Sequence, residues 1–179
     1  MLSYNVAGLL RRAPGSVARY GVTGETLELA EDLRLAAPIE GEITLARTGR
    51  SILARAELRT ALEEGCSRCL APTASPVEIR LEEEALPSID LMTGLPVDRS
   101  DEPDALRLDE HHELDLSEPV REAIALAEPI APLCRPECRG LCPECGVDLN
   151  EAPQHGHTED QIDPRLARLA EWRQTGGAN

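Results

Sequence analysis

Hydrophobic and polar residues alternate along two neighbouring segments, which predicts an antiparallel hairpin. Residues 39–45 place apolar side chains on one face and polar side chains on the other, and residues 52–63 repeat the pattern. The turn Thr48-Gly49-Arg50 lies between them, and period-two alternation on both sides of a glycine turn is typical of paired strands. The second segment is rich in helix-forming residues, so a helix over 52–64 is the competing interpretation. The expected apolar face comprises Ile39, Gly41, Ile43, Leu45, Ile52, Ala54, Ala56, Leu58, Thr60 and Leu62.

A third alternating segment, residues 77–82, follows the turn Cys66-Ser67-Arg68-Cys69. We therefore expect this turn to join two strands at one end of the sheet. Residues 86–114 are interrupted by prolines and a glycine and are rich in Asp and Glu. They predict a long acidic loop that is either disordered or binds a partner. His111-His112, at the end of this loop, are interpreted as solvated side chains.

Two helices are expected in the second half of the chain. The first begins near Ser117, a favourable N-cap, has Pro119 in its first turn and ends before Pro129. The second opens with Asp163 as N-cap and Pro164 at its first helical position. The apolar stripe of the first helix comprises Val120, Ala123, Ile124 and Ala127.

Cysteines change this picture more than any other residue type. Four of the six lie in the run Cys134-x3-Cys138-x3-Cys142-Pro-Glu-Cys145-Gly146. Two cysteines separated by two residues can clamp a tetrahedral Zn²⁺ from one tight turn, and a following glycine can take the positive φ that the turn needs. The run therefore predicts a closed structural metal site. The cofactor we expect is Zn2+.

Further candidate ligands are Cys66, Cys69, His155 and His157. Together with the run they make eight soft ligands, which suit two four-coordinate sites or one site with spare thiols. A redox dithiol is the alternative for Cys66 and Cys69, although the βαβ context of that motif is missing. A disulfide framework is the expectation for small secreted chains, and no secretory signal is recognised here.

These patterns predict an α+β fold with an antiparallel β-rich core, a long acidic loop, one or two helices and a C-terminal zinc knuckle. The expected division is a core over 1–133, with the loop at about 86–114, and a cysteine-rich tail with a terminal helix over 134–179. The core has no Phe, one Trp and two Tyr, so it must pack Leu, Ile, Val and Ala. A bound metal would help to stabilise such a core.

The net charge of −15 is concentrated in one segment. Residues 82–118 carry thirteen acidic residues against Arg99 and Arg107, whereas residues 1–81 are balanced. Such a surface opposes non-specific RNA binding, which depends on phosphate neutralisation, and suits a basic protein partner. No apolar run approaches membrane-spanning length, so no membrane is expected and the expected localisation is cytoplasmic, although the arginines of the first 24 residues faintly suggest a transit peptide.

Catalytic motifs are not found in the sequence. A glycine-rich phosphate loop, a nucleophile elbow and a His-Glu-x-x-His helix are all missing, and the ligand surplus differs from the open coordination position of catalytic zinc. We therefore expect a binding protein and not an enzyme.

The chain resembles the YceD-like family, which is associated with accumulation of large-subunit ribosomal RNA. Cys66-Ser67-Arg68-Cys69-Leu70 is similar to the C-x-R-C-L signature of that family, and His155-Gly156-His157 stands where many relatives carry Cys-x-Cys. The other matching stretches are Leu10-Arg11-Arg12-Ala13-Pro14-Gly15-Ser16, Glu83-Glu84, Leu133–Asn150 and Ile162-Asp163-Pro164-Arg165.

The resemblance implies a role in accumulation of this RNA and in ribosome assembly. Its partners would be the large-subunit precursor and a ribosomal protein or assembly factor, with direct RNA contact as a further option. Arg68, Arg135 and Arg139 flank the expected thiolates, so they would contact RNA or neutralise a zinc–thiolate centre. The alternatives are a thiol redox or metal-handling protein and a zinc-ribbon transcription adapter. The sequence gives no indication of oligomeric state.

Overall fold

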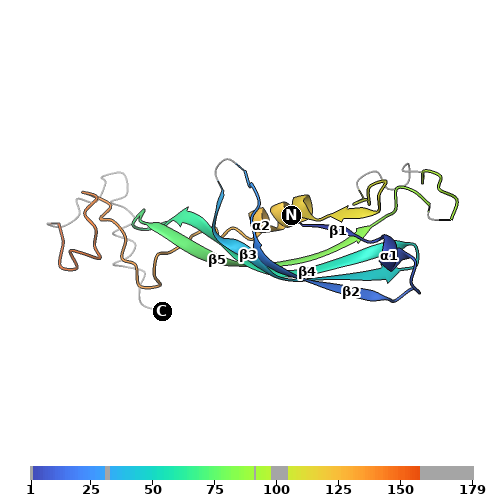
Figure 1. Cartoon of the computed structure of the whole chain (residues 1–179). Coiled ribbons are helices and arrows are strands. Elements are labelled where there is room, and N and C mark those ends of the chain that lie inside the picture. Colours follow the sequence, from blue (N-terminus) through green and yellow to red (C-terminus); the bar gives the residue numbers. More distant parts are fainter. Residues whose placement is uncertain (1, 31–32, 91, 98–104, 158–179) are drawn as a thin grey trace, which may run out of the picture. The chain divides into compact units, whose positions relative to one another are not determined.

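Four long strands form one antiparallel sheet in the computed structural model, which describes residues 2–30, 33–90, 92–97 and 105–157. The order in the sheet is β2-β3-β4-β5, so strands that follow one another in sequence are neighbours in space (Figure 1). Thr48 pairs with Ser51 across the β3–β4 turn, where Gly49 has a φ of 64°. The strands are β2 (Val17–Glu25), β3 (Arg34–Thr48), β4 (Ser51–Gly65) and β5 (Pro72–Ala85).

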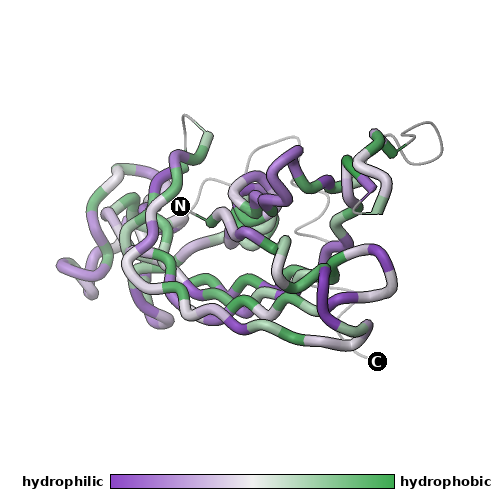
Figure 2. Tube along the Cα trace, turned by 45° about the vertical axis from the view of Figure 1, so that its right-hand side comes forward, coloured by the Kyte–Doolittle hydropathy of each residue, from purple (hydrophilic) through white to green (hydrophobic). Residues whose placement is uncertain are grey.

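The alternation predicted from the sequence is confirmed in the hairpin of β3 and β4. Ile39, Ile43 and Leu45 are buried on β3, and every second residue from Ile52 to Leu62 is buried on β4. Figure 2 shows the resulting change between hydrophilic and hydrophobic positions along the strands. The helix considered for residues 52–64 is wrong, because β-pairing on both sides of β4 outweighs the helix propensity of its residues.

A second layer covers the apolar face of the sheet. It contains a two-stranded ladder of β1 (Ser3–Asn5) and β6 (Glu113–Asp115), the short helix α1 (Ala7–Leu10), and α2 (Ser117–Leu126) (Figure 1). Val120 and Ile124 of α2 are fully buried in the same apolar core as the strand residues, which confirms the predicted stripe. Residues of the strands, of α1 and of α2 belong to one buried apolar cluster, so the core lies between the two layers.

Two expectations for this part of the chain need revision. Leu116, and not Ser117, is the N-cap residue of α2, and the Asp115 carboxylate accepts a hydrogen bond of 2.8 Å from the Ser117 N–H at the first helical position. The segment 86–114 is not shown as one long acidic loop, because Leu86 bridges Arg107 and Leu108 is buried. The elements β1, α1, β2 and β6 were not predicted. The helix expected from Asp163 lies outside the described residues.

The chain divides into two compact units, Met1–Cys138 and Arg139–Asn179. The first unit extends beyond the boundary at residue 133 that the sequence suggested, because Cys134 and Cys138 gather with Cys66 and Cys69. Neither of the two helices in the described part of the chain combines the length and the apolar character that crossing a membrane requires.

Candidate metal centres

The first unit brings four cysteines together at the end of the sheet where β4 passes into β5. Cys66 and Cys69 lie in the turn between these strands, as predicted, and Cys134 and Cys138 come from the segment that follows α2. The N–H and the hydroxyl of Ser67 both donate to the Pro132 carbonyl, at 2.8 and 3.0 Å. These bonds hold the two segments side by side.

The sulfur atoms of this cluster have the spacing of a tetrahedral metal site. The Sγ atoms of Cys66 and Cys138 are 3.8 Å apart, and those of Cys69 and Cys134 are 3.7 Å apart. Four sulfurs bound at about 2.3 Å to one tetrahedral zinc lie about 3.8 Å from each other, whereas a disulfide bond measures about 2.05 Å. The sulfur separations therefore fit a zinc ion and not a disulfide bond.

The second unit has a four-donor cluster of its own. Its donors are Cys142, Cys145, His155 and His157, and all four ligand atoms lie within 4.8 Å of one another. Each histidine turns its Nε2 to one sulfur at 3.1 Å, and the two Nε2 atoms are 3.0 Å apart. These distances are slightly shorter than the roughly 3.3–3.5 Å of a tetrahedral Zn²⁺ with two sulfur and two nitrogen ligands. The donor set therefore fits one zinc ion.

Both clusters are built on the same kind of cysteine turn. In the first, the Cys66 N–H donates to the Ala71 carbonyl (2.8 Å) and the Leu70 N–H donates to the Cys66 carbonyl (2.9 Å). In the second, the Cys142 N–H donates to the Val147 carbonyl (2.8 Å) and the Gly146 N–H donates to the Cys142 carbonyl (2.9 Å). The residue after the second cysteine has a positive φ in each turn, 61° at Leu70 and 74° at Gly146. The sequence indicated this conformation at Gly146 but not at Leu70.

Leu70→Gly is expected to stabilise the first turn. An L residue in the left-handed region costs roughly 1–2 kcal/mol, and Leu70 is 71% exposed, so little packing is lost with its side chain. We expect the free energy of unfolding of the zinc-loaded protein to rise by about 0.5–1 kcal/mol, as measured by urea unfolding. The reverse change, Gly146→Leu, should loosen the second turn, and a stabilised Gly146→Leu protein would contradict this account.

Glu144 orients one histidine of the second cluster. Its carboxylate lies 3.2 Å from Nδ1 of His157, which leaves Nε2 of that ring free to bind the metal. A carboxylate in this position fixes the tautomer and the direction of a metal-binding imidazole. Glu144 lies between the two cysteines of its turn, so one short segment supplies two ligands and the residue that orients a third.

Glu144→Gln should therefore weaken zinc binding at the second cluster by about 10–100-fold. Competition with a chromogenic chelator measures this change. Glu137→Gln is the matched control, since Glu137 is an exposed acid of the first unit. Equal affinities of the two variants would show that Glu144 does not position His157.

Backbone N–H groups already favour one thiolate in each cluster. The N–H groups of Cys134, Cys69 and Arg68 lower the pKa of the Cys66 thiol to about 6. The N–H groups of Cys145 and Glu144 likewise lower the pKa of Cys142 to about 6. Cys66 and Cys142 are buried, so their thiolates face the inside of the cluster, where a metal ion would bind, and not the solvent.

The Cys134 thiol resists ionisation when no cation is bound. Loss of hydration at the Cys134 sulfur, together with the neighbouring thiols of Cys69 and Cys138, raises the pKa of Cys134 to about 12. Four thiolates in one cluster repel one another, and a divalent cation removes this repulsion and releases the protons. All four cysteines of the first cluster are therefore expected to be thiolates only when a metal ion is bound.

The arginines that were proposed to flank the thiolates have different surroundings. Arg68 donates from Nη1 to the Cys138 carbonyl at 2.7 Å, and Arg139 donates from Nη1 to the Pro153 carbonyl at 2.7 Å. Both bonds go to the backbone that carries the ligands, and neither goes to sulfur. Arg135 is exposed. The hydrogen bonds of Arg68 and Arg139 therefore stabilise the backbone conformation of the cysteine segments.

The structure divides the candidate ligands differently from the simplest expectation. Cys134 and Cys138 join Cys66 and Cys69, whereas Cys142 and Cys145 join the two histidines. The four cysteines of the run 134–145 therefore do not gather in one group, because the chain passes from one unit to the other within that run. His111 and His112 belong to neither group. His111 is exposed, as expected, whereas His112 is half-buried and its Nδ1 is shielded from solvent, which differs from the expectation of two solvated side chains.

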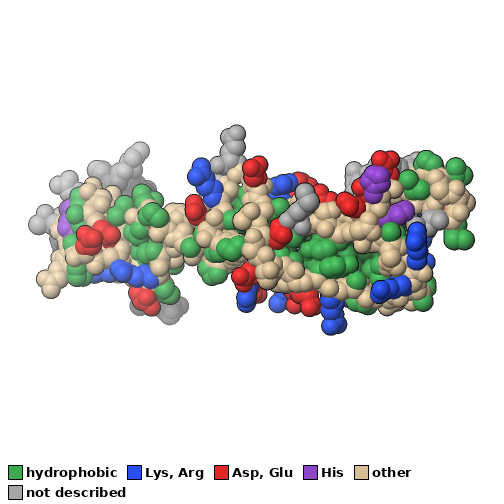
Figure 3. Space-filling view, viewed as in Figure 1, with side chains coloured by type: hydrophobic (Ala, Val, Ile, Leu, Met, Phe, Trp, Pro, Cys, Tyr) green, Lys and Arg blue, Asp and Glu red, His purple; other side chains and the backbone are tan. Residues whose placement is uncertain are grey.

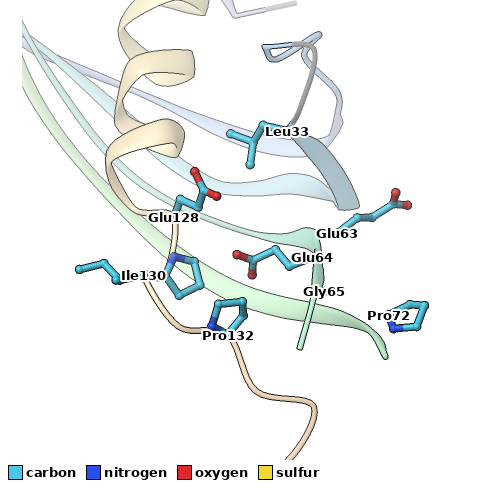
Figure 4. A pocket seen from close by; sticks show the side chains of 9 residues that line it. Leu33, Glu63, Glu64, Gly65, Pro72, Glu128, Ile130 and Pro132 are labelled. Atoms are coloured by element: carbon cyan, nitrogen blue, oxygen red, sulfur yellow. The ribbon is translucent and has the colours of Figure 1, made fainter. Parts of the chain in front are cut away.

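An acidic groove of about 520 Å³ lies next to the first cluster within the first unit. Figure 4 shows its two walls: Glu63 and Glu64 stand at the end of β4, and Glu128 and Ile130 lie on the segment after α2. None of the three carboxylates forms an ion pair with a residue in the described part of the chain. The Ile130 side chain is fully exposed. The groove therefore combines unpaired negative charge with apolar surface.

Comparison with known proteins gives one family and several bacterial relatives. An uncharacterized protein of Mycobacterium tuberculosis is 39% identical over 106 residues, which cover 59% of this chain and 48% of the relative. An uncharacterized protein of Mycobacterium leprae is 28% identical over 165 residues, which cover 90% of this chain and 69% of the relative. The chain spans about half the length of the first of these relatives.

No solved structure matches the chain. The profile of the family described as large ribosomal RNA subunit accumulation protein YceD matches residues 54–172, a range that includes all eight candidate cysteine and histidine ligands. This match covers more than half of the sequence. The chain therefore belongs to the YceD family.

Proposed function

We propose that the chain is a non-enzymatic zinc-binding protein that supports accumulation of large-subunit ribosomal RNA in the cytoplasm. Family membership carries the RNA part of this proposal. The two four-donor clusters support the metal part, since each has the donor set and the spacing of a structural zinc site. With all four donors supplied by the chain, each ion would lack the open position that catalytic zinc needs. The zinc ions would act as clamps that hold the cysteine segments in shape.

The proposed partner is a basic ribosomal protein or assembly factor of the large-subunit precursor. Its positive side chains would complement the acidic groove beside the first cluster and the acidic residues of 82–118. Because the Ser67–Pro132 bonds join the cysteine turn to one wall of the groove, zinc at the first cluster would also keep the groove open.

A sucrose-gradient ribosome profile of depleted cells tests the proposed function. We expect selective loss of large subunits and of their RNA, and recovery when the wild-type chain is expressed again. A variant with Cys66→Ser and Cys69→Ser should fail to restore the large subunits. A normal profile in depleted cells would refute the proposal and leave only the metal clusters.

A thiol redox or metal-handling role is the second candidate, since the pKa of Cys66 and that of Cys142 are both lowered to about 6. Burial opposes it, because Cys66 is 0% exposed and Cys142 is 6% exposed, whereas reactive thiolates need access. Rapid transfer of zinc to an acceptor, with the fold retained, would favour metal handling. Slow loss of zinc that is coupled to local unfolding would favour the structural role.

A further inference from the structure

The exposed arginines of the first unit fall into two groups. One group is neutralised by nearby carboxylates on the solvent-facing side of the sheet or on α2. The other group is exposed and forms no ion pair with any residue that the structure describes; its members are Arg11, Arg12, Arg19, Arg34, Arg50, Arg68, Arg80 and Arg135. Within this group, Arg11, Arg12 and Arg50 lie on segments that meet at one end of the sheet. The ion pairs of the first group are Arg55–Glu82 (2.7 Å), Arg59–Glu40 (3.2 Å) and Arg121–Glu118.

Backbone and side-chain hydrogen bonds hold together the segments that carry Arg11, Arg12 and Arg50 at one end of the sheet. The Gly15 N–H donates to the Arg47 carbonyl (2.8 Å), and the Arg47 N–H donates to the Ser16 carbonyl (2.9 Å). The Arg47 guanidinium donates to the carbonyls of Arg12 and Gly49. The segment after α1 is thereby held against the β3–β4 turn that carries Arg50. We call Arg11, Arg12, Arg47 and Arg50 the arginine end.

Few acids oppose this charge locally. The sequence has no Asp or Glu before Glu25, so the segment of Arg11 and Arg12 is purely basic. Glu84 is hydrogen bonded to Ser51 beside the turn. The Asp90 carboxylate accepts bonds from Thr93 and Met92, and these bonds, with a smaller contribution from the charge of Arg50, lower the pKa of Asp90. Figure 3 shows basic side chains grouped at the end of the sheet that carries the β3–β4 turn.

A local patch of this kind can bind an anion although the whole chain is acidic. The Debye length at physiological ionic strength is about 8 Å, so charges farther away are largely screened. An unpaired guanidinium can donate two parallel hydrogen bonds to one phosphate and is more weakly hydrated than an ammonium group. The positive charge at the arginine end is therefore available to a polyanion.

We propose that the arginine end is an RNA-binding surface that contacts the phosphate backbone. The choice of RNA over other polyanions rests on the proposed function, and the surface itself rests on the unpaired guanidinium groups and their fixed placement. Contacts of this kind position a protein on RNA without reading its sequence. Arg68, Arg135 and Arg139, which the sequence suggested for RNA contact, are not part of this surface.

Fluorescence anisotropy with a short fluorescein-labelled RNA hairpin tests the proposal. The test variant is Arg11→Gln, Arg12→Gln and Arg50→Gln in the zinc-loaded full chain. The control variant, Arg55→Gln, Arg59→Gln and Arg80→Gln, removes the same number of charges from the solvent face of the sheet. We expect the test variant to lose at least about tenfold in affinity at low salt, and the control variant to lose less than about twofold. Three lost phosphate contacts should also reduce the slope of log K against log salt by about 2.

Equal losses in the two variants, or no binding by the wild-type chain, would overturn the proposal. Displacement of the RNA by poly-glutamate at equal charge concentration would also overturn it, because the surface would then be a general anion site. Complementation separates this inference from the proposed function. If depletion reduces large subunits and the test variant restores them fully, the RNA surface is refuted and the proposed function stands.

Discussion

Replacing Cys66 and Cys138 by serine is expected to release the segment after α2 from the end of the sheet. The two sulfurs lie 3.8 Å apart and come from segments that the hydrogen bonds of Ser67 and the Arg68–Cys138 bond also join. Structural zinc contributes about 10–16 kcal/mol to the folding of small zinc-binding peptides, far more than these hydrogen bonds at about 1 kcal/mol each. Residues 66–71 and 129–138 should therefore lose most of their protection against amide hydrogen exchange, while β3 and β4 keep theirs.

The matched control is the pair Cys142→Ser and Cys145→Ser. This change should remove protection from residues 139–157 and leave residues 66–71 unchanged, since the two clusters have no ligand in common. Protection of 66–71 that survives in the first variant would show that hydrogen bonds alone hold this end. Simultaneous loss in both regions from either variant would show that the clusters are not independent.

Gly41→Ala should be the most destabilising small substitution in the sheet. Gly41 has a φ of 147°, and a Cβ at this position would lie 2.1 Å from the carbonyl oxygen of Glu57 on β4. The register of β3 shifts beside this residue, which brings the two backbones close together. Neither backbone can move without breaking the ladder, so we expect a loss of at least about 3 kcal/mol in the free energy of unfolding.

Gly21→Ala is the control for this prediction. Gly21 lies on β2 opposite Glu42, and nothing lies within 4 Å of the position of an added Cβ. Its effect should stay within about 1 kcal/mol and can be slightly stabilising, because alanine reduces the entropy of the unfolded chain. Urea unfolding at saturating zinc, followed by circular dichroism, compares the two. A Gly41→Ala protein as stable as the Gly21→Ala protein would rule out the close approach.

The sequence predicted the centre of the fold well and its periphery poorly. Alternation over 39–45 and 52–63 identified β3 and β4 because each strand buries one face, which imposes a period of two on its residues. The short elements β1, α1 and β6 have at most four residues each, too few to show a period. The strand β2 was missed because Gly21 and Gly24 interrupt its pattern.

The ligands of the candidate site were predicted individually, but their division was not. Cysteine and histidine identity and the C-x2-C spacing pointed to the eight residues that gather in the two clusters. The grouping depends on tertiary structure: the turn at Cys66 and the segment at Cys134 meet only because the sheet and α2 bring them to the same place. The arginine end was missed for the same reason, since Arg12 and Arg50 are far apart in the sequence.

Native mass spectrometry of the purified chain tests the central claim most directly, because it counts bound metal ions without any variant. Two zinc ions for each chain are predicted, one for each four-donor cluster. Cys66→Ser should reduce the count to one, and so should Cys142→Ser. A wild-type chain that carries no zinc, or a single ion that is lost in both variants, would contradict the account of two independent zinc clamps.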